Sequence, residues 1–137
     1  MELENLINDL IRDEGLELKP YRCTSNKLTI GVGRNIEDNG ITEAEARYLL
    51  HNDLGRVVHE LDQNAAWWKN LPDSQKNALI NMSFNLGWPR LSKFKNMLAA
   101  LEAGDFEKAA TEALDSRWAS QVGDRAHRIA AQIRGSA

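Results

Sequence analysis

The first residues of the chain alternate apolar and polar positions with the period of an α-helix. The apolar positions fall on one face of that helix: Leu3, Leu6, Ile7, Leu10 and Ile11. This pattern predicts a helix over residues 2–14, ended by Gly15. The next position on the apolar face is Glu14, so a carboxylate stands where the helix would be expected to bury an aliphatic side chain.

Short extended segments follow this helix. Residues 16–23 contain Pro20, which disfavours helix, and residues 28–32, "LTIGV", combine β-branched residues with glycine. Residues 25–27, "SNK", are typical of a turn between them. The pattern predicts a small antiparallel hairpin or a three-stranded ribbon.

A second helix is indicated by its start signals. Residues 37–40, "EDNG", predict a turn, after which Thr42 and Glu45 have the spacing of a capping box. Ile41 is placed to serve as the hydrophobic staple of that box. Apolar residues keep helical period to Leu61, which predicts a helix over 42–63, about 30 Å long.

The rest of the chain predicts helices separated by short breaks. Trp67 and Trp68 stand in the first break, where we expect them to anchor the chain in a core. Helices are predicted over 74–87, 91–103 and 106–115, the last capped by Asp105, before a final turn and helix.

These elements predict an α+β fold that is mainly α, in a single domain over 1–137. Its parts are a small β lobe over about 15–41, a connecting helix over 42–63, and a helical lobe formed by 1–14 and 64–137.

Composition excludes several classes of protein. The net charge is −3, and the charges of 1–89 and 90–137 differ only mildly, so no basic nucleic-acid-binding face is indicated. The single cysteine excludes an internal disulfide, and the three histidines have no metal-ligand spacing, so neither metal nor cofactor is expected. We expect His51 and His59 to face solvent. No segment has the length and apolarity of a signal peptide or membrane span.

Glu14 is the first candidate for chemistry. The negative end of the helix dipole and partial burial both disfavour the charged form of a carboxyl group at this position. A carboxyl group that keeps its proton can act as a general acid. The alternative is that Glu14 only ends the helix and points into water.

Glu14 also opens a recognisable motif. Cys23 follows after eight residues and Thr29 after five more, within "DEGLELKPY" and "LTIGVG". This E-x8-[DC]-x5-T arrangement resembles the N-terminal signature of phage-type lysozymes, glycoside hydrolase family 24. The segments "ITEAEARYLL", "ALINMSFNLG" and "SRWASQ" extend the resemblance over nearly the whole chain.

The resemblance implies a two-lobed lysozyme-like fold with a cleft between the lobes. It also implies hydrolysis of the β-1,4 bond between N-acetylmuramic acid and N-acetylglucosamine in peptidoglycan. Glu14 would protonate the leaving oxygen, while Cys23 and Thr29 would hold the attacking water. An inverting reaction of this kind needs roughly 6.5–9.5 Å between its two catalytic groups.

Further site residues follow from the resemblance. Gly31 and Gly33 would let a ligand approach the backbone, and a cleft-lining stretch would include Phe84, Asn85 and Gly87. Arg125 would pair with the catalytic glutamate. The alternatives are an Asn85 that caps its helix, an exposed Arg125, and core positions for the candidate stacking residues Trp88 and Trp118.

Two positions depart from the T-even members of the family. Cys23 replaces an aspartate, and a thiol carries little charge at neutral pH unless its surroundings favour the thiolate. Its alternative role is that of a small buried apolar residue, just as Thr29 has the alternative of a plain strand residue. Arg34 replaces a histidine, so any structural ion pair at that position must be rebuilt.

The leading hypothesis is therefore a monomeric muramidase that acts on peptidoglycan glycan strands and lyses the host. It would be made in the host cytoplasm and reach the periplasmic wall through a holin-type membrane lesion. A virion-associated muramidase of a tail or baseplate is a variant of this hypothesis. The runner-up is a lysozyme-fold module that binds glycan or a protein partner without catalysis, an alternative that Cys23 keeps open.

Overall fold

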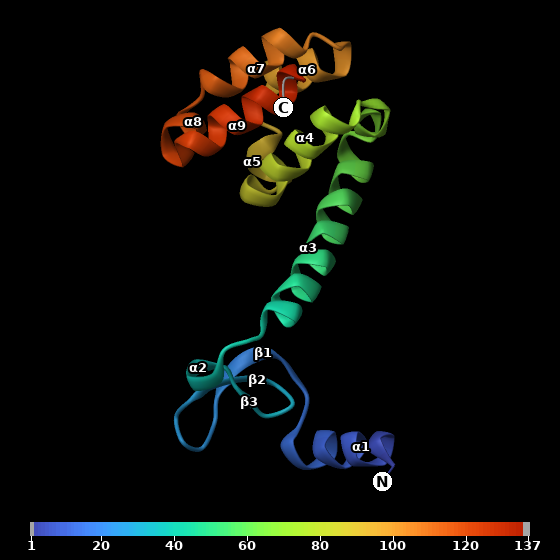
Figure 1. Ribbon diagram of the computed structural model, residues 1–137, viewed down its shortest axis with the longest axis vertical. Helices are drawn as coiled ribbons and strands as arrows, with labels where there is room; N and C mark the ends of the chain where they lie inside the picture. Colours follow the sequence, from blue (N-terminus) through green and yellow to red (C-terminus); the bar gives the residue numbers. More distant parts are fainter. Residues whose placement is uncertain (1, 136–137) are drawn as a thin grey trace. The chain divides into compact units, whose positions relative to one another are not determined.

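The computed structural model describes residues 2–135. These residues are mostly helical and include one small antiparallel sheet, which confirms the predicted α+β, mainly α class. The chain divides into two units, one up to Tyr48 and one from Leu49 onward. The first unit contains the sheet, and the second contains most of α3 (Glu43–Asn64) and the helices that follow it (Figure 1).

The first unit contains a helix followed by the sheet. Helix α1 (Leu3–Glu14) ends at Gly15, as predicted, because Gly15 adopts a φ of +83° and its N–H closes the last turn on Ile11. Strands β1 (Glu17–Arg22), β2 (Leu28–Gly31) and β3 (Arg34–Asn35) form an antiparallel sheet in chain order. The three-stranded form of the predicted ribbon is therefore the one that occurs.

Thr29 lies at the centre of this sheet. It is opposite Tyr21 on β1 and Asn35 on β3, and its side chain is only 3% exposed. Its position in the middle strand contributes to this burial, because a strand pairs with it on either side.

The apolar face of α1 differs from the expectation drawn from the sequence. The helix itself is confirmed, but its large apolar side chains are exposed: Leu3, Leu6, Ile7 and Leu10. The described residues of the first unit therefore do not bury the face that ends at Glu14.

The segment expected to be a plain turn is a single helical turn, α2 (Ile36–Asn39). Asn35 begins it by accepting a hydrogen bond from the Asp38 N–H on its side chain, and Gly40 ends it. The "EDNG" pattern indicated a chain reversal, but the cap that makes it helical is the preceding Asn35.

Helix α3 (Glu43–Asn64) begins in the first unit and continues into the second. The predicted capping box is confirmed: Thr42 N–H donates to Glu45 Oε1 at 2.9 Å, and Glu45 N–H donates to Thr42 Oγ1 at 3.1 Å. The box accounts for the observed start of the helix, because it satisfies N–H groups that have no partner within the first turn.

The second unit is helical. After α3 come the 3₁₀ helix η1 (Ala66–Asn70), α4 (Asp73–Leu86), α5 (Trp88–Leu91), α6 (Lys95–Ala103), α7 (Phe106–Leu114), α8 (Arg117–Val122) and α9 (Asp124–Arg134). Helix α9 packs against α4, α7 and α8, and α6 packs against α7 (Figure 1).

The large, fully buried apolar side chains of the described chain belong to the second unit: Leu61, Leu79, Met82, Leu91, Met97, Leu101, Ile129 and Ile133. Trp68 is buried beside them and Trp67 is half-buried against the same core, as expected for that break. Two hydrogen bonds fix α4 to the end of α9, from Ser74 Oγ to the Gln132 carbonyl and from Gln75 Nε2 to the Ile133 carbonyl.

The helix predicted over 91–103 is shorter and begins later. Pro89 lies in the first turn of α5, where its missing N–H costs nothing, and the chain then turns tightly before α6. The N–H groups of Lys93 and Phe94 bond to the carbonyls of Arg90 and Leu91, and these three-residue spacings interrupt the helix. By contrast Asp105 caps α7 as predicted, accepting from the Lys108 N–H.

Two surface expectations can also be checked. His51 and His59 are exposed, as predicted, and so is His127. None of the helices within residues 2–135 has the length and apolarity needed to cross a membrane.

Candidate functional site

Glu14 lies on the last turn of α1 and is exposed. The expectation of partial burial is therefore not met within the first unit. The neighbouring cation on the helix, Arg12, pairs with Asp9 and Asp13 instead. Within residues 2–48, the described part of the first unit, the carboxylate of Glu14 takes part in neither a hydrogen bond nor a salt bridge.

The side chain of Glu14 lies against the turn between β2 and β3. Its carboxylate and its stem occupy the side of Gly33 where another residue would carry a Cβ atom. Gly33 has a φ of +62°, a conformation that favours glycine. The turn thus brings the catalytic candidate Glu14 to one of the two predicted glycines.

Cys23 and Thr29 are brought together by a shared backbone acceptor. The Cys23 N–H donates to the Lys27 carbonyl at 3.0 Å, and the Thr29 hydroxyl donates to the same oxygen at 2.9 Å. The turn between them is closed by Asn26, whose φ of +59° is stabilised in a tight turn. Cys23 and Thr29, which were predicted to act together, are therefore held side by side by the Lys27 carbonyl.

The thiol of Cys23 is half-buried, and its surroundings favour the thiolate. The backbone of Lys27 lowers the pKa of Cys23 most, followed by the Thr29 hydroxyl and the backbone of Ser25, because hydrogen bonds from these groups favour the ionised sulfur. This environment differs from the purely apolar one of a buried structural cysteine, where burial would raise the pKa.

Helix α2 holds the turn that carries these groups. Glu37 Oε1 accepts from the Leu28 N–H at 3.1 Å and from Arg22 Nη1 at 3.2 Å, while Lys27 Nζ lies 3.3 Å from Asp38 Oδ1. The Leu28 N–H is the main cause of the lowered pKa of Glu37, and Asp38 is the main cause of the raised pKa of Lys27.

Sequence reasoning missed the supporting role of Glu37 and Asp38, which it assigned to a turn. The signal that could have found them is Asn35, a good helix cap placed directly before two acidic residues within the next turn.

Arg34 has a defined partner. Its guanidinium makes a two-pronged contact with Glu45, with Nη2 to Oε2 at 2.6 Å and Nη1 to Oε1 at 3.0 Å, and it also donates to the Gly40 carbonyl. This contact and the Thr42 N–H lower the pKa of Glu45 from 4.5 to about 2. The ion pair expected at Arg34 is thus made with Glu45, whose carboxylate also belongs to the predicted capping box.

The remaining predicted residues lie in the second unit. Phe84 and Gly87 line a hollow of about 390 Å³ together with residues of α3, namely Asp53, Arg56, Val57 and Glu60. Phe84 is 43% exposed, so its ring is available to a ligand. Asn85 Oδ1 accepts from the indole N–H of Trp118 at 2.8 Å, so Asn85 is tied to the core rather than serving only as a helix cap.

Arg125 is held by Asn81. Its Nε and Nη2 donate to Asn81 Oδ1 at 3.0 and 2.7 Å, and Nη2 also reaches the Asn81 backbone carbonyl. The pairing of Arg125 with Glu14 stays a prediction, because the two residues belong to different units. The same limit applies to a cleft between the lobes.

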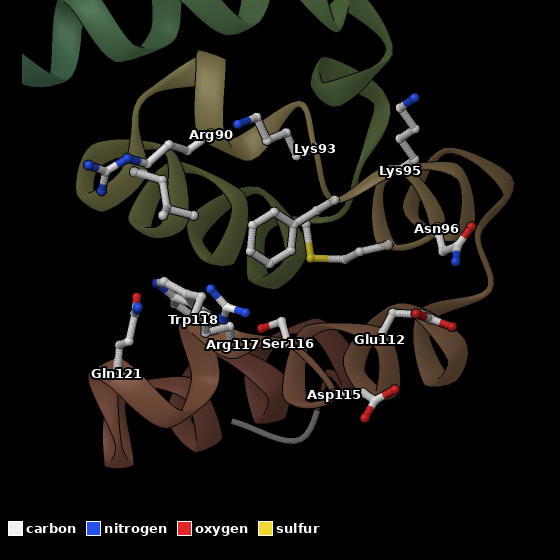
Figure 2. A pocket seen from close by; sticks show the side chains of 13 residues that line it. Arg90, Lys93, Lys95, Asn96, Glu112, Asp115, Ser116, Arg117, Trp118 and Gln121 are labelled. Carbon is white, nitrogen blue, oxygen red and sulfur yellow. The ribbon is translucent and has the colours of Figure 1, made fainter.

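A larger cavity of about 650 Å³ lies between α5, α6, α7 and α8, and it contains none of the predicted catalytic residues (Figure 2). Phe94 and Trp118 meet edge to face at its base, with ring centres 6.2 Å apart. Trp118 is 4% exposed and belongs to the core, while Trp88 is half-buried and donates its backbone N–H to Glu60. The charged residues at the rim of the cavity form no salt bridge within residues 2–135: Arg90, Lys93, Lys95, Glu112, Asp115 and Arg117.

The structure therefore groups the predicted residues in two sets. Glu14, Cys23, Thr29, Gly31 and Gly33 lie in the first unit, around the sheet. The other set lies in the second unit: Phe84, Asn85, Gly87 and Arg125. In the described part of the chain, histidine, cysteine and acidic side chains do not gather into a group of three that could hold a metal ion.

Comparison with known proteins identifies the family of the chain. The sequence model described as "Phage lysozyme" matches residues 12–133. The pre-baseplate central spike protein Gp5 of Enterobacteria phage T4 is 34% identical, over 88% of this chain but only 26% of the spike protein. The chain therefore spans about a quarter of that relative.

Two relatives of similar length carry lysozyme names. Probable T4-type lysozyme 1 of Dictyostelium discoideum is 29% identical over 93% of this chain and 92% of the relative. An endolysin of Acyrthosiphon pisum secondary endosymbiont phage 1 is 32% identical over 74% of this chain and 69% of the relative. With most of its length matched to the family's sequence model, the chain belongs to the phage lysozyme family, a family of lysozyme-type glycoside hydrolases.

Proposed function

We propose that the protein is a muramidase, which hydrolyses the β-1,4 bond between N-acetylmuramic acid and N-acetylglucosamine in bacterial peptidoglycan. The observation that carries this proposal is the grouping of Glu14, Cys23 and Thr29 around one small sheet in the spacing of the family. The Glu14 side chain lies against the β2–β3 turn, and Cys23 and Thr29 share the Lys27 carbonyl.

In this proposal Glu14 donates a proton to the glycosidic oxygen as the bond to the sugar breaks. Within the first unit the Glu14 carboxyl group is exposed and has no ionic partner, so no contact of that unit has to break before it meets the oxygen. The water that adds to the anomeric carbon on the opposite face would release a proton to solvent, and Glu14 would take one proton back from solvent, so the proton count balances.

Cys23 and Thr29 would orient the water that attacks the anomeric carbon from the opposite face. The Thr29 hydroxyl offers oxygen lone pairs to such a water while its proton is donated to Lys27. A water attacking opposite the leaving group inverts the anomeric configuration, so an inverting reaction is part of the proposal.

Two further parts of the proposal concern the biological setting. We infer that hydrolysis serves lysis of the host wall, since relatives are named endolysins, with access through a holin-type membrane lesion. The match to a spike protein favours, as the second setting, a virion-associated enzyme that acts at entry. In both settings the enzyme would act as a monomer on glycan strands.

The product identifies the bond that is cut. Peptidoglycan digested by the protein is reduced with borohydride and hydrolysed, and the sugar alcohols are then separated. A muramidase yields muramitol from the new reducing ends, whereas glucosaminitol would show cleavage of the other glycosidic bond and would overturn the proposal. Sedimentation with peptidoglycan without any new reducing end would instead support the non-catalytic binding module.

A further inference from the structure

Gly33 lies so near the Glu14 side chain that the conformation of the turn alone does not account for glycine at this position. A Cβ atom at position 33 would lie 2.9 Å from Glu14 Oε2, and 3.3 Å from both Glu14 Cβ and Glu14 Cδ. Real Cβ atoms essentially never approach a heavy atom to within 3.0 Å. The absence of a side chain at this position is what makes room for the carboxylate.

Other glycines of the first unit show that this is not a general feature of the fold. Gly31 and Gly40 have φ values of +73° and +60°, so they share the backbone requirement of Gly33. A Cβ atom at either of them would find no heavy atom within 4 Å. Only backbone conformation explains glycine at those two positions, whereas Gly33 carries the additional contact.

We propose that Gly33 is the positioning residue for the catalytic acid, an inference that rests on the proposed function of Glu14. Because the carboxylate has no hydrogen-bonded or ionic partner within residues 2–48, contact with the β2–β3 turn is what limits its position within the first unit. This changes the interpretation of Gly33: the close approach that its missing side chain permits is made by Glu14 itself.

The geometry predicts how a methyl group at position 33 acts. It touches the stem of Glu14 as well as its end, so turning the terminal carboxylate alone cannot relieve the contact. The whole side chain must move away from the turn. A displacement of about 1 Å in a reacting group can cost about 10²-fold in rate.

The test compares Gly33→Ala with Gly40→Ala, which imposes a similar positive-φ strain without touching Glu14. We expect kcat on peptidoglycan to fall by about 10²-fold in Gly33→Ala, with KM little changed and an altered pH profile of kcat. Gly40→Ala should lose stability while keeping kcat and the pH profile. Equal kcat and equal pH profiles for the two variants would overturn the proposal.

A second measurement needs neither catalysis nor a folded variant at position 33. The NMR resonances of Gly33 in the native protein should move as Glu14 is titrated, and that movement should be absent in Glu14→Gln. Gly33 resonances that do not respond to Glu14 would overturn the proposal. If the resonances respond but the native protein hydrolyses no peptidoglycan, the proposed function fails, and the positioning role fails with it.

Discussion

At the scale of single residues, the interaction of Cys23 with Thr29 depends on which acceptor receives the hydroxyl proton of Thr29. The Thr29 hydroxyl has a single hydrogen, which it donates to the Lys27 carbonyl when the cysteine is a thiol. The same hydrogen can turn to the sulfur when Cys23 ionises, which is one of the reasons for the lowered pKa of Cys23. Thr29 therefore influences both the thiol and any water bound beside it.

Replacing Thr29 by valine should raise the pKa of Cys23, because it removes a hydrogen bond that favours the thiolate. The measurement is the rate of alkylation of Cys23 by iodoacetamide as a function of pH, which follows the thiolate fraction. Thr24→Val, at an exposed position of the same turn, is the control and should leave the midpoint unchanged. A midpoint that stays the same in Thr29→Val would remove Thr29 from the set of groups acting on the thiol.

Replacing Cys23 by serine tests whether the thiolate is needed at all. If residue 23 only orients a water, the serine hydroxyl can replace it, and activity should stay within about tenfold of native, a difference of roughly 1.4 kcal/mol in the barrier. The assay is the initial rate of peptidoglycan hydrolysis at matched protein concentration. Complete loss of activity in a folded variant would instead assign the chemistry to sulfur.

At the scale of elements, Glu45 connects the start of α3 to the sheet. It caps the helix through Thr42 and receives both arms of the Arg34 guanidinium from β3. Arg34 also reaches the Gly40 carbonyl at the end of α2. Glu45 and Arg34 together thus join β3, α2 and α3, and the contacts of Glu45 with Arg34 and Thr42 lower its pKa.

Glu45 should make stability depend on pH in a defined window. Its pKa is lowered to about 2 in the folded protein from the ordinary 4.5, so the unfolded chain binds more protons between these values. The stabilisation is fully present above pH 4.5 and is lost as the pH falls toward 2. The urea midpoint followed by circular dichroism should therefore be higher for native protein than for Glu45→Gln at about pH 7, and the difference should close near pH 2.

Glu43→Gln is the matched control for this prediction. Glu43 lies two residues earlier on the same helix and contacts Arg47 at an exposed position, an arrangement that contributes little to stability. The urea midpoint of Glu43→Gln should follow that of the native protein across the whole pH range. A constant gap between native protein and Glu45→Gln down to pH 2 would show that charge on Glu45 is not what stabilises the junction.

At the scale of the whole molecule, the two units differ in how they are stabilised. The second unit contains the large buried apolar side chains, whereas the first relies on sheet hydrogen bonds and charged contacts around α2 and α3. All four tryptophans, at positions 67, 68, 88 and 118, are in the second unit. Tryptophan fluorescence therefore reports on the unit with the larger core.

Truncation in this core should be costly. Leu79 is 1% exposed on α4, and Leu79→Ala should lower the free energy of unfolding by about 2–5 kcal/mol, measured by urea titration with tryptophan fluorescence. Leu18→Ala removes the same atoms from a side chain that is 82% exposed, and should change the value by less than about 0.5 kcal/mol. Similar losses in both variants would contradict the assignment of the core to the second unit.

The features that could be predicted from the sequence are those that depend on local patterns. Helix starts at Thr42 and Asp105 followed from their caps, and the end of α1 followed from Gly15, because each signal acts within one turn of helix. The candidate site was indicated by the resemblance of the segments around Glu14, Cys23 and Thr29 to phage-type lysozymes.

Features that depend on pairing across elements could not be predicted in this way. The shared Lys27 carbonyl requires the positive φ of Asn26 and the register that places Thr29 opposite Tyr21. The choice of Glu45 as partner of Arg34 requires α2 to bring the chain back toward β3. Periodicity likewise shows which face of α1 is apolar and not what covers it, and the first unit itself leaves that face exposed.

The most direct test of the central claim is the release of new reducing ends from purified peptidoglycan by native protein and by Glu14→Gln. Glu4→Gln, at an exposed position on the same helix, controls for the loss of a charge from α1. We predict release by the native protein and by Glu4→Gln, and none by a folded Glu14→Gln. Native-like release by Glu14→Gln would contradict the account, because the proton for the leaving oxygen would then come from another group.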